Sequence, residues 1–185
     1  PAESMCAVAS LSPLRPVMQA MTLVALAGRR LGLEPAYGID GFLSSMARGL
    51  GKPVISLETP ESQIALLLQP TQAASEELIA GTLDELENGR ALRTVQRLAE
   101  AWGASQLDEL ANYAQWCDCL NTAEQRAFQR RLIDERNLVL ADKVAALHRE
   151  SGPVFAAVGA LHMTGPQGLP ALLAARGFEV ERVPY

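Results

Sequence analysis

Residues 152–165 read GPVFAAVGALHMTG, and this stretch decides the predicted fold. Residues 154–158 are a short apolar run after a Gly-Pro break, a pattern typical of a strand buried on both faces. Gly159 ends this strand, and Thr164 can cap the helix that follows. Residues 178–183 alternate like a further strand. The C-terminal part of the chain is therefore predicted to fold as strand, turn, helix and strand.

A histidine and a glutamate occupy equivalent places in this scheme. His162 follows the predicted strand 154–158 directly, and Glu58 follows a second apolar run, residues 54–57. If the two strands run parallel in one sheet, both side chains lie at the edge where open α/β sheets bind their ligands. A carboxylate and a neutral imidazole can ligate a divalent cation, or act as general base and positioning group. The sequence thus predicts a site built on Glu58 and His162.

Helices account for most of the remaining chain. Apolar residues recur at helical spacing with polar residues between them. The predicted helical segments are residues 14–31, 41–50, 71–86, 90–102 and 107–116, a helix that starts at residues 59–61, and a long helix that starts at residues 121–124 and runs to 148. Together with the strands, they predict a single α/β or α+β domain over residues 1–185, with a small buried sheet and a dominant helical block.

Composition excludes some classes of function. A net charge of -5 and a pI near 5.1 argue against a nucleic-acid surface. No run of eighteen apolar residues is present, so no membrane span is expected. The hydrophobic fraction of 49% is ordinary for a globular domain.

The sequence is compatible with more than one redox state of its three cysteines. The spacing Cys117-Asp118-Cys119 makes a disulfide between these two residues strained, and no second ligand pair accompanies them for a zinc site. A disulfide from Cys6 to one of them is one alternative, and small buried thiols are the other.

Several motifs, taken together, resemble one family. The segment Gly159-Ala160-Leu161-His162, followed by Thr164-Gly165 and Arg176-Gly177-Phe178, resembles the C-terminal end of the TraB/GumN family. Residues 38–40, 57–63 and 134–137 agree with this resemblance and occur in the family's order. Members of the family begin with a strand that carries a first Gly-x-x-His motif, but here the only histidines are His148 and His162. The chain therefore resembles the C-terminal two-thirds of a member and is expected to be N-terminally incomplete, without the family's N-terminal strands.

The resemblance also implies an activity, because the family is similar to the Tiki metallopeptidases. It implies metal-dependent hydrolysis of a peptide or another small polar substrate, with a divalent metal ion as cofactor. His162 would be a metal ligand, Glu58 a ligand or base, and Arg136 an electrostatic or orienting group. The resemblance further implies a periplasmic or extracytoplasmic location.

A non-catalytic function is the alternative. The protein could bind a peptide or a polysaccharide component or act in signalling, as the family's link to pheromone shutdown and polysaccharide gene clusters suggests. An unpaired sheet edge would favour a homo-oligomer, or pairing with the missing N-terminal part.

Each candidate residue also has a structural interpretation. Glu58 can cap the helix that starts at Pro60, and Arg136 can form an ion pair with Asp134 or Glu135. The other polar residues considered are Asp40 as a helix N-cap, Asn137 as a hydrogen bonder on a helix face, His148 as a solvated side chain, and Gln63 as a residue that could face the cleft.

Overall fold

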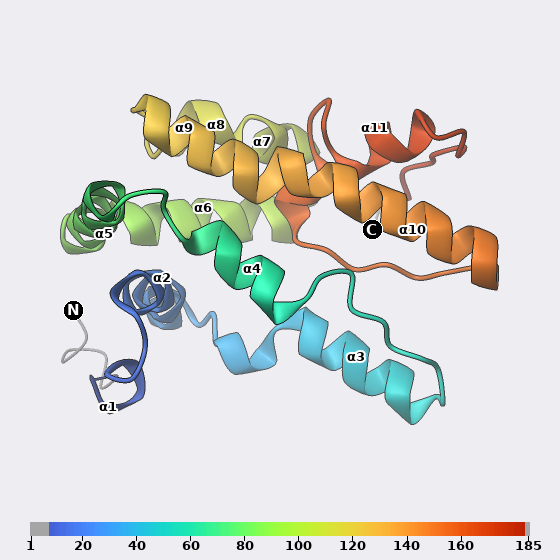
Figure 1. Cartoon of the computed structure of the whole chain (residues 1–185), viewed down its shortest axis with the longest axis horizontal. Helices are drawn as coiled ribbons and strands as arrows, with labels where there is room; N and C mark the ends of the chain where they lie inside the picture. The colour runs from blue at the N-terminus through green and yellow to red at the C-terminus, as the bar shows by residue number, and fades with distance from the viewer. Residues whose placement is uncertain (1–7, 184–185) are drawn as a thin grey trace. The chain divides into compact units, whose positions relative to one another are not determined.

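The computed structural model describes residues 8–183, which form helices joined by turns and extended segments (Figure 1). The elements are α1 (Val8–Leu11), α2 (Pro16–Ala27), η1 (Gly28–Leu31), η2 (Pro35–Tyr37), α3 (Ile39–Gly49), α4 (Pro60–Leu67), α5 (Gln72–Glu87), α6 (Arg90–Gly103), α7 (Leu107–Ala111), α8 (Tyr113–Trp116), α9 (Ala123–Arg130), η3 (Arg131–Glu135), α10 (Arg136–Ser151), η4 (Ala160–Met163) and α11 (Leu169–Ala174).

The predicted α/β or α+β fold with a small buried sheet is wrong. Residues 54–57, 154–158 and 178–183 have no regular secondary structure, and the described chain contains no strand. Phe155 is 81% exposed, so the run 154–158 is not buried on both faces either. An apolar run favours an extended backbone, but a strand also needs a partner for its hydrogen bonds.

The helix predictions hold for most of the chain. Residues 72–87 and 90–103 are helical as the pattern predicts. The N-cap of α5 is Thr71, whose hydroxyl accepts from the Ala74 amide at 3.1 Å. Two predicted caps are wrong. Asp40 lies inside the first turn of α3 after Gly38, and Thr164 precedes a turn, so that α11 begins only at Leu169. Within residues 8–183, no helix has both the length and the apolar character that a membrane crossing requires.

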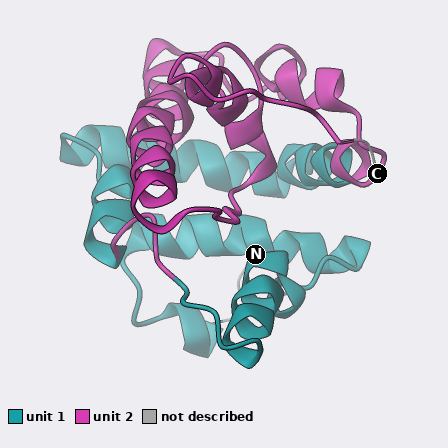
Figure 2. Cartoon of the chain, turned by 90° about the vertical axis from the view of Figure 1, so that its right-hand side faces the viewer, with its two compact units in different colours: residues 1–54, 60–99 teal, residues 55–59, 100–185 magenta. Residues whose placement is uncertain are grey.

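The chain divides into two compact units (Figure 2). Unit 1 contains residues 1–54 and 60–99, and unit 2 contains residues 55–59 and 100–185. Compact units are not by themselves separate domains, so the single domain stays a prediction. The short segment 55–59 belongs to unit 2 although the chain on either side of it belongs to unit 1.

Unit 1 is held together by α2 and α5. Leu11 and Leu23 are buried, and Leu26, Leu83 and Leu86 pack against them. Leu11 ends α1, whereas the other four leucines recur at helical spacing on α2 and α5, which is why the amphipathic pattern predicts these two helices.

Unit 2 is built on α10. Leu140 and Ala141 of this helix and Leu169 of α11 form a buried cluster. Leu57 and Val158, from the extended segments 54–57 and 154–158, pack against the same cluster. Leu57 and Val158 therefore pack against α10 and α11 rather than in a sheet.

Candidate functional site

Helix α10 is the element that organises the candidate site. α9, η3 and α10 follow one another as a single long rod, in which η3 is a π-helical turn (Figure 1). Arg136 is the first residue of α10 and Asn137 the second. A π-helical turn shifts the side chains that follow it around the helix axis, and such turns are frequent at functional sites.

Arg136 holds Glu58 in a bidentate ion pair. Its Nε donates to Glu58 Oε1 at 3.0 Å and its Nη2 to Oε2 at 2.6 Å. The side chains are only 21% and 14% exposed, respectively. Nη1 of Arg136 donates to the carbonyl of Leu132, so the guanidinium is fixed on its other side as well. The alternative prediction, an ion pair of Arg136 with Asp134 or Glu135, is not what the structure shows. The partner of Arg136 is Glu58, which is 78 residues away in the sequence.

Asn137 holds the imidazole of His162. Both residues are buried, with Asn137 fully inaccessible and His162 7% exposed. The Asn137 amide nitrogen donates to the carbonyls of Gln167 at 2.7 Å and His162 at 3.4 Å. Its Oδ1 lies 2.7 Å from His162 Nδ1.

These contacts determine the histidine tautomer. Because the two carbonyls use the amide hydrogens of Asn137, its Oδ1 must be an acceptor, and Nδ1 of His162 must carry the hydrogen between them. In the neutral ring, Nε2 then has the free electron pair. A nitrogen of this kind can take a proton or bind a metal ion.

The surroundings keep this imidazole neutral. Burial lowers the pKa of His162 below its usual 6.5, and the positive charge of Arg136 lowers it further. The carboxylate of Glu58 acts in the opposite direction and raises the pKa of the ring. The net direction is downward, so the unprotonated ring is favoured near neutral pH.

The structure therefore brings Glu58, Arg136 and His162 together, but not in the predicted way. The predicted sheet edge does not exist, and α10 is the common support instead. The segment before Glu58 is tied to this helix by Lys143, whose Nζ donates to the Leu57 carbonyl at 2.6 Å. The roles of these three residues stay predictions.

The other polar residues considered lie elsewhere. Asp40 and Gln63 are exposed residues of unit 1, on α3 and α4. His148 is exposed near the end of α10, with its ring edge-on to Phe178 at 5.4 Å between centroids. Asn137 is the exception, because it lies at the site. The sequence predicts a hydrogen-bonding residue on a helix face, but it does not give the partner His162, which is 25 residues away.

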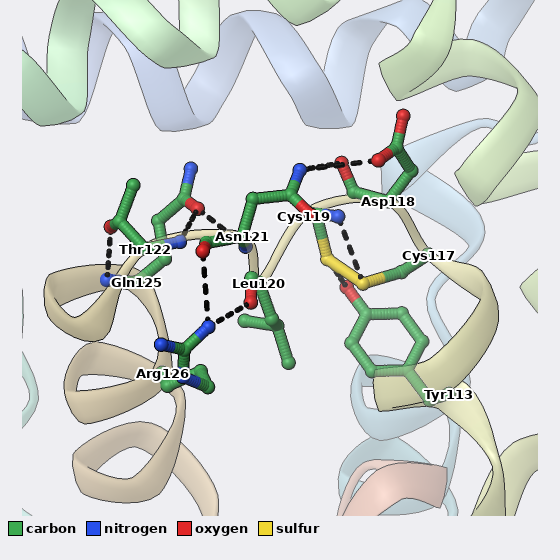
Figure 3. Close-up of a disulfide and its surroundings, with 9 residues drawn as sticks. All are labelled: Tyr113, Cys117, Asp118, Cys119, Leu120, Asn121, Thr122, Gln125 and Arg126. Atoms are coloured by element: carbon green, nitrogen blue, oxygen red, sulfur yellow. Dashed lines mark hydrogen bonds between the residues drawn. A yellow bond between two sulfur atoms is a disulfide. The ribbon is translucent and has the colours of Figure 1, made fainter.

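The cysteines also differ from expectation. Cys117 and Cys119 form a disulfide with each other, despite the strain that the short ring predicts (Figure 3). Neither is therefore a free thiol. Cys6, the other predicted partner, lies outside the described residues.

The residues present fit a metal ion only in part. Nε2 of His162 is a suitable ligand, but both oxygens of Glu58 accept hydrogen bonds from Arg136. From residue 8 to residue 183, no group of three or more His, Cys, Asp or Glu side chains is placed to hold a metal ion. His162 and Glu58 alone would thus give a metal ion fewer side-chain ligands than the three or four that zinc sites in proteins usually have.

Comparison with known proteins agrees with the resemblance seen in the motifs. The sequence model of the TraB/PrgY/gumN family matches residues 2–182. The chain belongs to the TraB/PrgY/gumN family. Among its relatives is the protein named "Uncharacterized protein YbaP" of Escherichia coli (strain K12), which is 35% identical over 168 residues, or 89% of this chain. The protein of the same name in Shigella flexneri matches equally well.

The matched region is only part of these relatives. The chain spans 58% of the length of each YbaP protein. No solved structure matches the chain. The further similarity to Tiki metallopeptidases stays a prediction.

Proposed function

We propose that this member of the TraB/PrgY/gumN family is a hydrolase in which His162 activates the attacking water. The observation that carries the proposal is the Asn137–His162 bond of 2.7 Å, which leaves Nε2 as the acceptor of the ring. A general base must be unprotonated at the working pH and fixed in orientation. Burial and Arg136 meet the first condition by lowering the pKa of His162, and Asn137 meets the second.

Each neighbouring side chain has a role in the proposed step. Nε2 takes a proton from water, and the resulting hydroxide attacks a carbonyl carbon of the substrate, which gives a tetrahedral oxyanion. The oxyanion then collapses, the bond from the carbonyl carbon to the leaving group breaks, and the imidazolium returns the proton to that group. The imidazolium that forms is stabilised by the negative charge of Glu58, which acts to raise the pKa of the ring. Arg136, fixed by its two bonds to Glu58, is the nearby positive charge for the oxyanion. The substrate is a peptide or a small polar molecule, in line with the resemblance described above.

A divalent metal ion is the second arrangement open to the same imidazole. A bound ion would lower the pKa of water and polarise the carbonyl, with His162 as one ligand. Glu58, held by Arg136, would serve as the further ligand. A periplasmic or extracytoplasmic location, and pairing with a second copy or with further chain, belong to the same proposal.

The test uses the fact that the chain has two histidines. Hydrolysis of a peptide mixture by the full-length protein is measured through the release of new amino termini, for wild type, His162→Gln and His148→Gln. Loss of the general base should lower the rate about 10²- to 10⁴-fold in His162→Gln. His148→Gln, which changes an exposed ring, should retain the wild-type rate.

Metal titration by calorimetry separates the two arrangements. Zinc or manganese binding by wild type and His148→Gln, but not by His162→Gln, would assign His162 as a ligand. Hydrolysis without metal binding would favour the arrangement in which His162 acts as the general base. If wild type neither hydrolyses the peptides nor binds either metal, the proposal is wrong and the non-catalytic binding function takes its place.

A further inference from the structure

The proposed hydrolysis uses none of the cysteines, yet the chain carries a disulfide with unusual surroundings. Cys117 and Cys119 lie in the short link between α8 and α9, with Asp118 between them (Figure 3). A bridge over a sequence separation of 2 closes a very small loop. Such a loop removes little entropy from the unfolded chain, so the bridge is a weak structural staple.

The backbone between the two cysteines has an uncommon conformation at Asp118. Its φ is 50°, in the left-handed region, which is unfavourable for most L-residues and which aspartate and asparagine tolerate best after glycine. The Asn121 amide donates to the Asp118 carboxylate and carbonyl, both at 3.1 Å, which helps to hold this conformation (Figure 3). Opening the disulfide releases the backbone at Asp118. Strained disulfides are the ones that exchange readily.

The two sulfur atoms differ in access and in bonding. Cys117 is 3% exposed, whereas Cys119 is half-buried. A thiolate from solution therefore reaches Cys119, and Cys117 is the leaving group. The backbone amide of Cys119 donates to Cys117 Sγ at 3.2 Å, which stabilises negative charge on that sulfur. The Tyr113 hydroxyl lies 3.2 Å from Cys119 Sγ and donates to it, because a disulfide sulfur carries no hydrogen.

We propose that Cys117 and Cys119 form a thiol–disulfide exchange centre that oxidises the thiols of a cysteine-containing peptide or a small thiol. A thiolate attacks Cys119 Sγ, the bond between Sγ of Cys117 and Sγ of Cys119 breaks, and the electron pair passes to Cys117 Sγ. The product is a mixed disulfide at Cys119 and a thiolate at Cys117. A second substrate thiolate then attacks the substrate sulfur of the mixed disulfide and releases Cys119. Two substrate thiols are thus oxidised to one disulfide, and the protein gains two electrons and two protons.

The first test measures the exchange equilibrium with glutathione as the probe. The full chain with Cys6→Ser is incubated with mixtures of reduced and oxidised glutathione, and the exchange is quenched with acid. Free thiols are then alkylated, and mass spectrometry of the intact protein gives the reduced fraction. The pair should become at least half reduced when reduced glutathione is in about a hundredfold excess, as in exchange-active disulfides. A pair that stays oxidised in this buffer would overturn the proposal.

Single-cysteine variants test which sulfur is attacked. In the Cys6→Ser chain, Cys117→Ser leaves Cys119 alone, and Cys119→Ser leaves Cys117 alone. Oxidised glutathione should form the mixed disulfide at Cys119 at least about tenfold faster than at Cys117, because exposure controls access. Equal rates, or a faster reaction at Cys117, would contradict the assignment. Circular dichroism establishes that both variants fold.

A matched pair of substitutions at Asp118 tests the strain. Asp118→Asn and Asp118→Ala both remove the charge, but asparagine tolerates a positive φ and alanine does not. The alanine variant should be reduced about fivefold more readily than the asparagine variant at equilibrium. Equal equilibrium constants would contradict a bridge held under backbone strain.

Discussion

At the scale of single residues, the chemistry of the site depends on a buried, neutral imidazole. His162 is 7% exposed and is held through Nδ1 by Asn137. A ring that is buried without charge is a stability determinant as well as a candidate base, because protonating it carries a desolvation cost. Two measurements separate these effects.

The first prediction concerns pH and stability. The folded-state pKa of His162 lies below the 6.5 of the unfolded chain, so the unfolded state binds more protons between these two values. The free energy of unfolding should therefore fall as pH drops through 6.5, and this contribution should stop changing below the folded-state pKa. The slope from one group is at most about 1.4 kcal/mol per pH unit.

Urea unfolding at a series of pH values measures this effect. The difference between wild type and His162→Gln isolates the contribution of His162 from that of the carboxylates. His148→Gln should follow wild type throughout. A difference between wild type and His162→Gln that does not change with pH would contradict the lowered pKa.

The second prediction concerns the tautomer. Nitrogen NMR of the wild-type protein at pH 8 should show His162 as the Nδ1-protonated form, because Asn137 Oδ1 accepts that hydrogen. Asn137→Leu should lose this preference and destabilise the protein by about 2–3 kcal/mol, since it leaves the Gln167 carbonyl and the ring without their partner. The exposed His148 supplies the reference spectrum. An unprotonated Nδ1 in the wild-type protein would contradict the assignment.

At the scale of elements, the turn between His162 and α11 is set by a glycine. A Cβ at Gly168, the residue before α11, would lie 2.5 Å from the Thr164 carbonyl oxygen. That is closer than non-bonded atoms can approach, so the loop of residues 164–168 folds tightly only with glycine here. The loop also supplies the Gln167 carbonyl that accepts from Asn137. Gly168 is thus required for the packing of the loop that supports the site.

Gly168→Ala should therefore destabilise the protein by about 1–3 kcal/mol and disturb the tautomer signal of His162. Gly81→Ala is the matched control. Gly81 lies inside α5, has no positive φ, and has open space where its Cβ would be. Alanine there should stabilise the protein by about 0.5–1 kcal/mol. Thermal unfolding of both variants measures the contrast, and equal effects would show that the close approach at Gly168 can relax.

At the scale of the whole molecule, the chain enters unit 2 twice. Residues 55–59 join unit 2 although their flanks belong to unit 1. Their attachment rests on the bonds of Arg136 to Glu58 and of Lys143 to Leu57, and on the packing of Leu57. The bond of Arg136 to Glu58 joins residues that are 78 positions apart in the sequence, and the bond of Lys143 to Leu57 joins residues that are 86 positions apart.

Glu58→Gln should loosen this attachment and lower the free energy of unfolding by about 2–4 kcal/mol, because a largely buried guanidinium is left unpaired. Glu34→Gln is the control, since the pair of Glu34 with Arg29 is exposed and spans only five residues. The control should cost less than about 1 kcal/mol. Hydrogen exchange should rise in residues 55–59 only in Glu58→Gln. Unchanged exchange there would contradict the role of the pair in holding the segment.

Most of the helices and the family could be predicted from the sequence, because helical periodicity and family motifs are local features of the chain. The sequence misjudged the sheet, since an apolar run at 154–158 does not specify a partner strand. Only the tertiary structure decided that Glu58 and His162 meet on α10, that Asn137 fixes the ring, and that Cys117 bonds to Cys119. The first two contacts join distant positions, and the third depends on the backbone accepting a left-handed residue at Asp118. Composition and spacing do not reveal the first two contacts, because these depend on how distant parts of the chain pack together.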